Sequence, residues 1–231
     1  MIPWSMDYTY ILVIIGAAIS ALASAYVNIT FQKYSKYSNS RGLRAEDAAG
    51  LILRNADTDE VRIERISGSL TDHYSPSEKV LRLSDTVYHS TSVAAIGVAA
   101  HECGHAIQHK VGYFPIKLRS IAVPVANIGS KLSWPVILIG LIFGLQFLVD
   151  IGIFLFLFVL AFQLITLPVE FNASRRAIKI LDENDYLSDE ELKGAKKTLK
   201  AAALTYVASA FSTILQLFRL ILIAGGRRRN D

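Results

Sequence analysis

Four long apolar segments divide the chain, and polar stretches separate them. They cover Tyr8–Val27, Leu132–Val149, Ile151–Pro168 and Ala201–Ala224. Each has about 18 to 24 residues, and about 20 apolar residues are enough for a helix to cross a bilayer. The pattern predicts four transmembrane helices, with the middle two forming a hairpin that turns at Asp150, because a carboxylate in mid-membrane is costly. A cleaved signal peptide is the alternative for the first segment, but residues 1–10 lack the basic residues that usually begin one.

The polar stretches predict a small α/β region outside the membrane. Helical spacing of apolar residues predicts a short helix over Ala45–Asn55 and a longer one capped by Thr91 or Ser92. Strand-like patterns occur at Val61–Ile66, Leu70–Tyr74 and Lys79–Leu83. After the hairpin, Glu170–Leu181 is amphipathic and basic, and Ser188 begins a polar helix with acidic residues in its first turn.

The expected fold is therefore a mainly α membrane protein, with about four transmembrane helices and a small α/β region at the membrane surface. The expected boundaries are 1–27 for the first span, 28–131 for the α/β region, 132–168 for the hairpin, 169–200 for the amphipathic and linker helices, and 201–231 for the fourth span with a basic tail.

The positions of the basic residues predict which side of the membrane each polar stretch occupies. Of 231 residues, 52% are hydrophobic and 19% charged, with a net charge of +4. The basic residues flank the apolar segments, which favours a membrane protein over a nucleic-acid-binding one. All but four of the 24 Lys and Arg lie in the stretches 28–131 and 169–200, so the positive-inside rule places these in the cytoplasm. The cluster Arg227–Arg229 argues the other way.

The chemistry is concentrated in His101-Glu102-Cys103-Gly104-His105, within the helix that follows Ser92. Residues four apart share a helix face, so both histidines can bind one metal ion, and Glu102 can reach a water molecule beside it. The alternative interpretation of this motif is a polar turn of an ordinary helix that binds no metal. Gly104 would allow another element to approach the helix closely. Cys103, the single cysteine, excludes an intrachain disulfide and is expected to be a small buried side chain.

Two histidines need a third protein ligand, because a catalytic zinc site usually has three and keeps one position for water. His109 lies on the same face, but a helix rises about 6 Å in four residues, so three histidines in a row cannot converge on one ion. Glu170 follows the hairpin, which can return it to the motif. It is the preferred ligand, and the alternative is an acid that complements a helix dipole.

The segments LTDHYSPSEKVLRLS, VYHSTSVAAIGVAAHECGHAIQH and PVEFNASRRAIKIL resemble the YugP-like membrane neutral zinc metallopeptidases, and the layout more distantly resembles gluzincins of the HtpX and Ste24 type. The resemblance covers nearly the whole chain. It implies a zincin-like region with one zinc ion on His101, His105 and Glu170, and Glu102 as general base. HtpX-type proteins have an aspartate four residues after the ligand glutamate. Here Ser174 stands there, so the support that the aspartate gives to a ligand histidine is either missing or supplied by a weaker hydroxyl.

The expected function is zinc-dependent hydrolysis of peptide bonds in membrane or membrane-adjacent proteins, through a zinc-activated water. A non-catalytic metal-binding membrane scaffold or transporter is the alternative. The expected partners are the lipid bilayer and a protein or peptide substrate, without nucleic acid. Leu70–Tyr74 is expected to pair with an extended substrate. The residues considered as oxyanion donors or as supports of a ligand are Arg175, Arg176, His109, Ser174, His73 and Tyr206.

Overall fold

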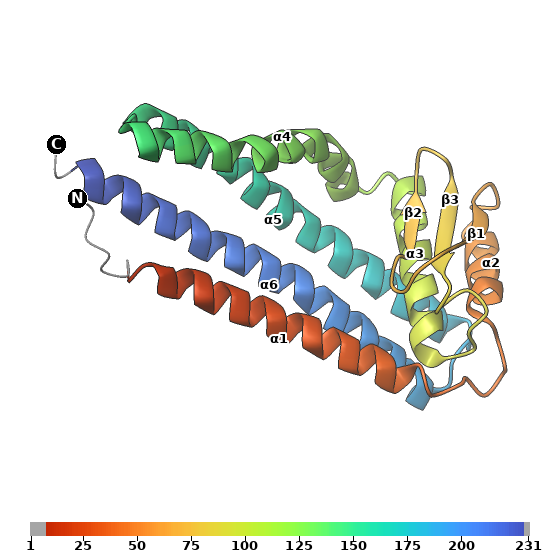
Figure 1. Cartoon of the computed structure of the whole chain (residues 1–231). Helices are drawn as coiled ribbons and strands as arrows, with labels where there is room; N and C mark the ends of the chain where they lie inside the picture. Colours follow the sequence, from red (N-terminus) through yellow and green to blue (C-terminus); the bar gives the residue numbers. More distant parts are fainter. Residues whose placement is uncertain (1–7, 229–231) are drawn as a thin grey trace. The chain divides into compact units, whose positions relative to one another are not determined.

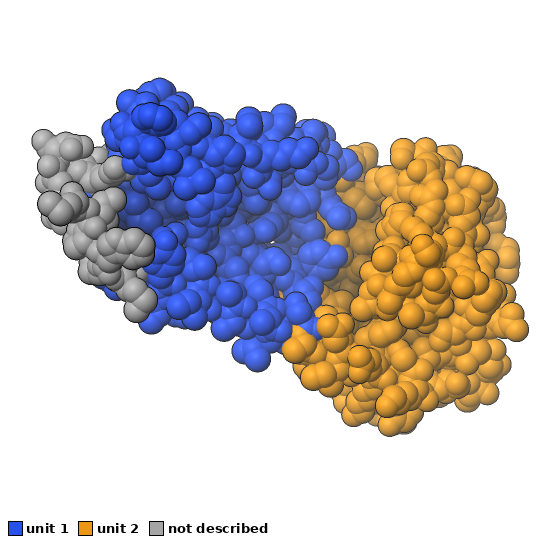
Figure 2. Space-filling view, in the orientation of Figure 1, with its two compact units in different colours: residues 1–24, 118–167, 205–231 blue, residues 25–117, 168–204 orange. Residues whose placement is uncertain are grey.

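The computed structural model describes residues 8–228 and divides the chain into two compact units. The first unit comprises residues 1–24, 118–167 and 205–231, and the second comprises residues 25–117 and 168–204 (Figure 2). Residue 229 of the basic cluster lies outside the described part. The chain is mostly helical with one small mixed sheet, as the sequence predicts.

Within residues 8–228, four helices are long and apolar enough to cross a membrane, in agreement with the four predicted spans. They are α1 (Tyr10–Tyr34), α4 (Phe114–Phe143), α5 (Gln146–Glu183) and α6 (Asp189–Arg228). Within the first unit, the Ser212 hydroxyl donates to the carbonyl of Gly16 at 2.8 Å, which joins α6 to α1. Large apolar side chains such as Ile14 and Leu22 are exposed, as lipid-facing residues of a membrane protein are.

The hairpin turn lies at Gly144 and Leu145, and the prediction of a turn at Asp150 was wrong. Gly144 has a φ of 71°, which suits glycine at the end of a helix, and Leu145 N–H donates to the Gly140 carbonyl at 2.9 Å. Asp150 lies in the second turn of α5, where its carboxylate accepts a hydrogen bond from Gln146 at 3.1 Å.

Helix boundaries also differ from those expected. The α4 helix begins at Phe114, although residues up to 131 were assigned to the α/β region, and it continues past Pro124 and Pro135. The α5 helix likewise runs through Pro168. One helix, α6, covers both the expected linker helix and the fourth span, without a break at residue 200. A change from polar to apolar composition therefore does not end these helices.

The second unit contains α2 (Ala45–Asn55), α3 (Val93–Lys110) and three strands, β1 (Arg62–Ile66), β2 (His73–Ser75) and β3 (Val80–Ser84). The strand order is β1-β3-β2, with β1 parallel and β2 antiparallel to β3 (Figure 1). These elements match the predicted helices and strands to within a few residues. Because β3 is central, β2 is an edge strand, and it contacts α3.

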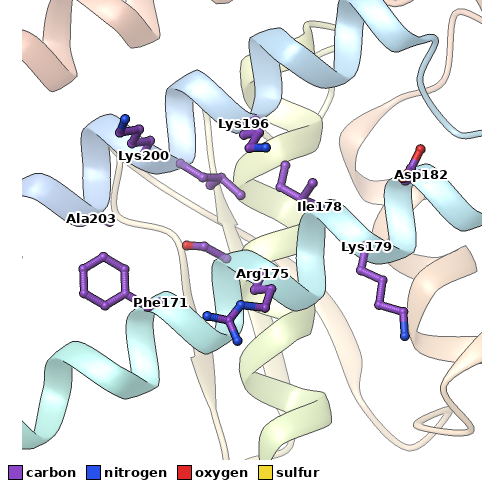
Figure 3. Close-up of a pocket in the computed structure, with 10 residues that line it drawn as sticks. Phe171, Arg175, Ile178, Lys179, Asp182, Lys196, Lys200 and Ala203 are labelled. Atoms are coloured by element: carbon purple, nitrogen blue, oxygen red, sulfur yellow. The ribbon is translucent and has the colours of Figure 1, made fainter.

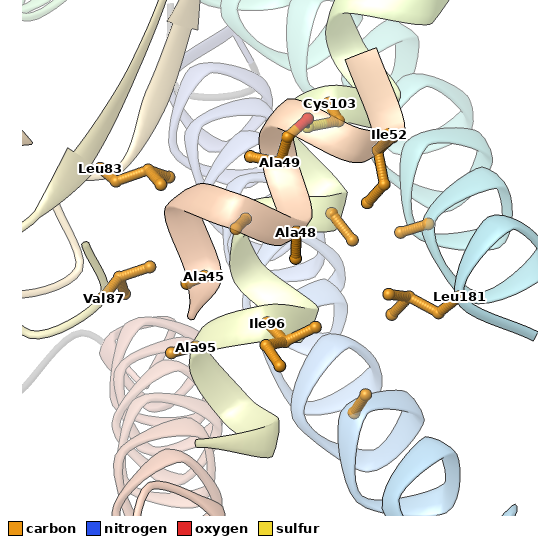
Figure 4. Close-up of a cluster of buried hydrophobic side chains, with 14 of the residues drawn as sticks. Ala45, Ala48, Ala49, Ile52, Leu83, Val87, Ala95, Ile96, Cys103 and Leu181 are labelled. Carbon is orange, nitrogen blue, oxygen red and sulfur yellow. The ribbon is translucent and has the colours of Figure 1, made fainter. Parts of the chain in front are cut away.

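Small apolar residues position α3 in the core of this unit. Its start is capped by Ser92, whose hydroxyl accepts from Ala95 N–H at 3.2 Å. Ala48, Ala49 and Cys103 are fully buried between α2 and α3, beside larger residues such as Ile52 (Figure 4). Alanines at these positions let the two helices pack closely. Cys103 is free and buried, as expected, and burial raises the pKa of its thiol.

Candidate metal centre

The two histidines of the motif share one face of α3. Their rings are 4.8 Å apart between centroids and nearly perpendicular. His105 is buried and His101 is partly buried. Their spacing of four residues places them one turn apart on α3, so a single helix positions both rings.

Glu170 of α5 completes a group of three ligand atoms that lie within 4.8 Å of one another. Its Oε2 is 3.2 Å from His101 Nε2 and 3.6 Å from His105 Nε2. Two ligands bound at about 2.0–2.1 Å to a tetrahedral zinc ion are separated by about 3.3–3.4 Å. The observed separations bracket this value, and two imidazoles with one carboxylate are a usual zinc donor set. The three residues therefore fit a zinc ion.

Gly104 allows α5 to come this close to α3. A Cβ atom built at Gly104 would lie 2.7 Å from the carbonyl oxygen of Ala173. Any side chain at this position would therefore push the α5 backbone away, and Glu170 is three residues from Ala173. The close approach expected at Gly104 is confirmed, and it brings Glu170 to the histidines.

Hydrogen bonds orient both imidazoles toward Glu170. The Nδ1 of His101 is 3.0 Å from the Ser174 hydroxyl, and the Nδ1 of His105 is 3.0 Å from Gln108 Oε1. The amide nitrogen of Gln108 donates to the Val169 carbonyl at 2.8 Å, so its Oε1 must accept from His105. This bond holds the proton on Nδ1 and leaves the lone pair of Nε2 for a metal.

Gln108 is a supporting residue that the sequence analysis missed. It is fully buried, and besides Val169 it donates to Asn172 Oδ1 at 3.0 Å. It therefore ties α3 to α5 as well as orienting His105. The available signal was its position three residues after His105, which places it next to that histidine on the helix.

Glu102 is buried, and its negative charge raises the pKa of His105. Burial by itself lowers the pKa of His105, but the hydrogen bond to Glu170 and the charges of Glu102 and Glu170 raise it, with a net increase. Among the described residues, no side chain or backbone group donates a hydrogen bond to the Glu102 carboxylate. This carboxylate is therefore available to accept a proton.

Asp72 is a second acidic residue near the motif that the sequence analysis did not select. It precedes β2 and accepts hydrogen bonds from the backbone N–H of Ser84 at 2.7 Å and from its hydroxyl at 2.9 Å. Burial raises its pKa more than these bonds lower it, and the charge of Glu102 raises it further. These two bonds hold Asp72, the residue before β2, against Ser84 at the end of β3.

The residues considered as oxyanion donors occupy different surroundings. Arg176 donates from Nε to Asn172 Oδ1 at 2.8 Å, and Arg175 lines a cavity between α5 and α6. The His109 ring lies 5.7 Å from the Tyr74 ring, and His73 Nδ1 is 2.9 Å from the Thr71 carbonyl. Tyr206 belongs to the first unit. The oxyanion donor stays a prediction.

A family model described as "Putative neutral zinc metallopeptidase" matches residues 9–225. The chain belongs to this family. It is also 42% identical over 220 residues to a protein of Bacillus subtilis (strain 168) named "Putative membrane protease YugP", with 95% of this chain and 98% of that protein covered. No solved structure matches the chain. The resemblance found in the sequence is confirmed, and with four spanning-length helices the chain is a membrane protein.

Proposed function

We propose that this protein is a zinc-dependent membrane endopeptidase of the gluzincin type, acting on membrane or membrane-adjacent proteins. The observation that carries the proposal is the convergence of His101, His105 and Glu170 at zinc-ligand separations, with Glu102 in the adjacent helical position. The family and the Bacillus subtilis relative support the same chemistry.

Each residue of the site has a defined task in peptide hydrolysis. His101, His105 and Glu170 would hold one zinc ion, which when bound polarises the scissile carbonyl and makes water more acidic. Glu102 accepts the proton of the attacking water and delivers it to the leaving amine. Gln108 keeps His105 in the tautomer that metal binding requires, and Ser174 holds the orientation of the His101 ring.

The edge strand β2 is the proposed binding place for the substrate backbone. It pairs with β3 along one side only, over His73–Ser75, so its other side can pair with an extended peptide. Its contact with α3 brings such a peptide to the helix that carries Glu102. The predicted strand at Leu70–Tyr74 is shorter in the structure, and the proposal applies to β2.

We propose a cytoplasmic position for the site. Lys33, Lys36, Arg41 and Arg44 follow the first apolar segment directly, and Arg175 and Arg176 follow the third. Basic residues that flank spans in this way are retained on the cytoplasmic side. The protein would then be a multi-pass protein of the cell membrane.

The deciding experiment compares wild-type protein with Glu102→Gln, which keeps all three ligands. Zinc content is expected to stay the same, while cleavage of casein falls by about 10²–10⁴-fold, because only the proton acceptor is lost. Glu170→Ala is expected to lose zinc as well as activity. A chelator should abolish cleavage by the wild type, and added zinc should restore it.

Two outcomes would contradict the proposal. Undiminished casein cleavage by Glu102→Gln would exclude Glu102 as the base. Full zinc occupancy with no cleavage of any protein by the wild type would favour the scaffold or transporter alternative. Glu64→Gln is the matched control, since Glu64 lies on β1 and forms ion pairs with Arg62 and Arg82 only on the surface of the sheet.

A further inference from the structure

A cavity of about 510 Å³ lies between α5 and α6 within the second unit. Pockets for small ligands commonly have volumes of about 300–1,000 Å³. Its walls combine apolar side chains with basic ones (Figure 3). The lining residues are Phe171, Ser174, Arg175, Ile178, Lys179, Asp182, Lys196, Leu199, Lys200 and Ala203.

The charge of this cavity is strongly positive. Four of its lining residues are basic and one, Asp182, is acidic. Lys179 is paired with Glu183 at 3.5 Å, whereas Arg175, Lys196 and Lys200 form no ion pair with any described residue. Three exposed cations around one hollow therefore have no protein anion to neutralise them, which complements an anionic ligand.

The apolar part of the cavity lies at a fixed position along both helices. Phe171 comes three residues after the third apolar segment ends at Pro168, and Ala203 lies at the start of the fourth. Arg175 and Lys200 are about one turn farther from these segments, and Lys196 is one turn farther again. The lining residues nearest the spans, Phe171 and Ala203, are thus apolar, and all four basic lining residues lie farther from the spans.

From this arrangement we propose that the cavity binds an anionic phospholipid. The phosphate would contact Arg175, Lys196 and Lys200, and the glycerol and first acyl carbons would lie against Phe171 and Ala203. This order of groups is that of a lipid in a bilayer, with its acyl chains toward the spans. A free phosphate ion would use the basic residues but leave the apolar wall exposed.

The cavity also adjoins the metal centre through one residue. Ser174 lines it, and the same hydroxyl lies 3.0 Å from His101 Nδ1. A lipid in the cavity would cover Ser174 and so shield the support of a ligand histidine from water. Lipid binding itself needs neither zinc nor proteolysis, so the proposal stands independently of the proposed function.

The test is native mass spectrometry of the full chain in neutral detergent, titrated with dioctanoyl phosphatidylglycerol. We expect one tightly bound lipid, with phosphatidylcholine of the same chain length and glycerol phosphate binding much more weakly. Lys196→Gln/Lys200→Gln should weaken phosphatidylglycerol binding by about thirtyfold, since each basic residue near an anionic lipid contributes about a factor of 5.4. Lys196→Arg/Lys200→Arg should retain it.

The matched control is Lys193→Gln/Lys197→Gln, which removes two charges from the same helix at residues that line another hollow. This variant is expected to bind phosphatidylglycerol like the wild type. Equal losses in both glutamine variants would mean non-specific charge attraction and would overturn the proposal. So would equal binding of phosphatidylcholine, displacement by glycerol phosphate at equal concentration, or displacement by an acidic peptide.

Discussion

At the scale of single residues, the candidate site depends on which atoms of its side chains are already hydrogen-bonded. His101 and His105 each use Nδ1 for a neighbour and turn Nε2 toward Glu170. Gln108 therefore sets the tautomer of His105 before any metal binds, and the Ser174 hydroxyl orients the His101 ring. In the proposed zinc site, residues that touch neither metal nor substrate would thus control metal affinity.

Gln108 provides the sharpest test of this control. Gln108→Leu keeps the buried volume but removes the acceptor for His105 Nδ1, so we expect zinc to bind about 10–100-fold more weakly. A competition titration with a zinc-sensitive dye measures this. Gln32→Leu, at an exposed position of α1, is the matched control and should leave the affinity unchanged. Unaltered affinity in Gln108→Leu would show that His105 needs no such support.

The raised pKa of His105 predicts how zinc binding depends on pH. Zinc needs unprotonated Nε2, and without metal His105 keeps its proton to a higher pH than an ordinary histidine, whose pKa is about 6.5. Zinc affinity should therefore fall with acidification, starting above that value. Without zinc, the stabilisation from protonated His105 is complete at low pH and disappears as pH rises through its folded-state pKa. Zinc titrations between about pH 6 and about pH 8 test the prediction, and a constant affinity would contradict it.

At the scale of helices and strands, the contact between α3 and α5 determines how near Glu170 lies to the two histidines. Backbone meets backbone there, because Gly104 has no side chain and Ala173 is fully buried. Backbone contacts cannot adapt as flexible side chains do. Even one added methyl group at Gly104 would therefore increase the distance between the two helices and move Glu170 away from the histidines.

Gly104→Ala tests this contact. The added methyl would lie 2.7 Å from the Ala173 carbonyl oxygen, so we expect a loss of about 1–3 kcal/mol in the free energy of unfolding and a lower zinc content. Thermal unfolding and metal analysis measure both. Gly225→Ala is the control, because open space surrounds Gly225 and alanine favours helix there. A stabilised Gly104→Ala protein with full zinc would refute the role of the glycine.

At the scale of the whole molecule, the proposed orientation makes opposite predictions for two surface positions. Leu145→Cys in the hairpin turn should react with a membrane-impermeant maleimide in intact cells. Asp57→Cys, in the turn after α2, should react only after permeabilisation. Native Cys103 need not be replaced, because burial raises its pKa and blocks access. The reverse labelling pattern would place the candidate site outside the cytoplasm.

Sequence reasoning predicted most of the elements because their signals are local. The four apolar segments, the strands and the cap at Ser92 depend on residues near one another in the chain. The hairpin turn was misplaced because charge was weighed above backbone conformation. Asp150 could pair with Gln146 inside a helix, whereas Gly144 could adopt the positive φ that ends one.

The order of residues alone is sufficient for the candidate metal motif, since spacing along one helix places His101, Glu102 and His105 together in any fold that keeps the helix. It also determined the membrane character, which depends only on segment length and apolarity. Only the tertiary structure decided how closely α5 approaches α3, and therefore that Glu170, Ser174 and Gln108 act on the same two imidazoles. Such contacts join residues about 60 to 70 positions apart, and no local pattern encodes the distance between two packed helices.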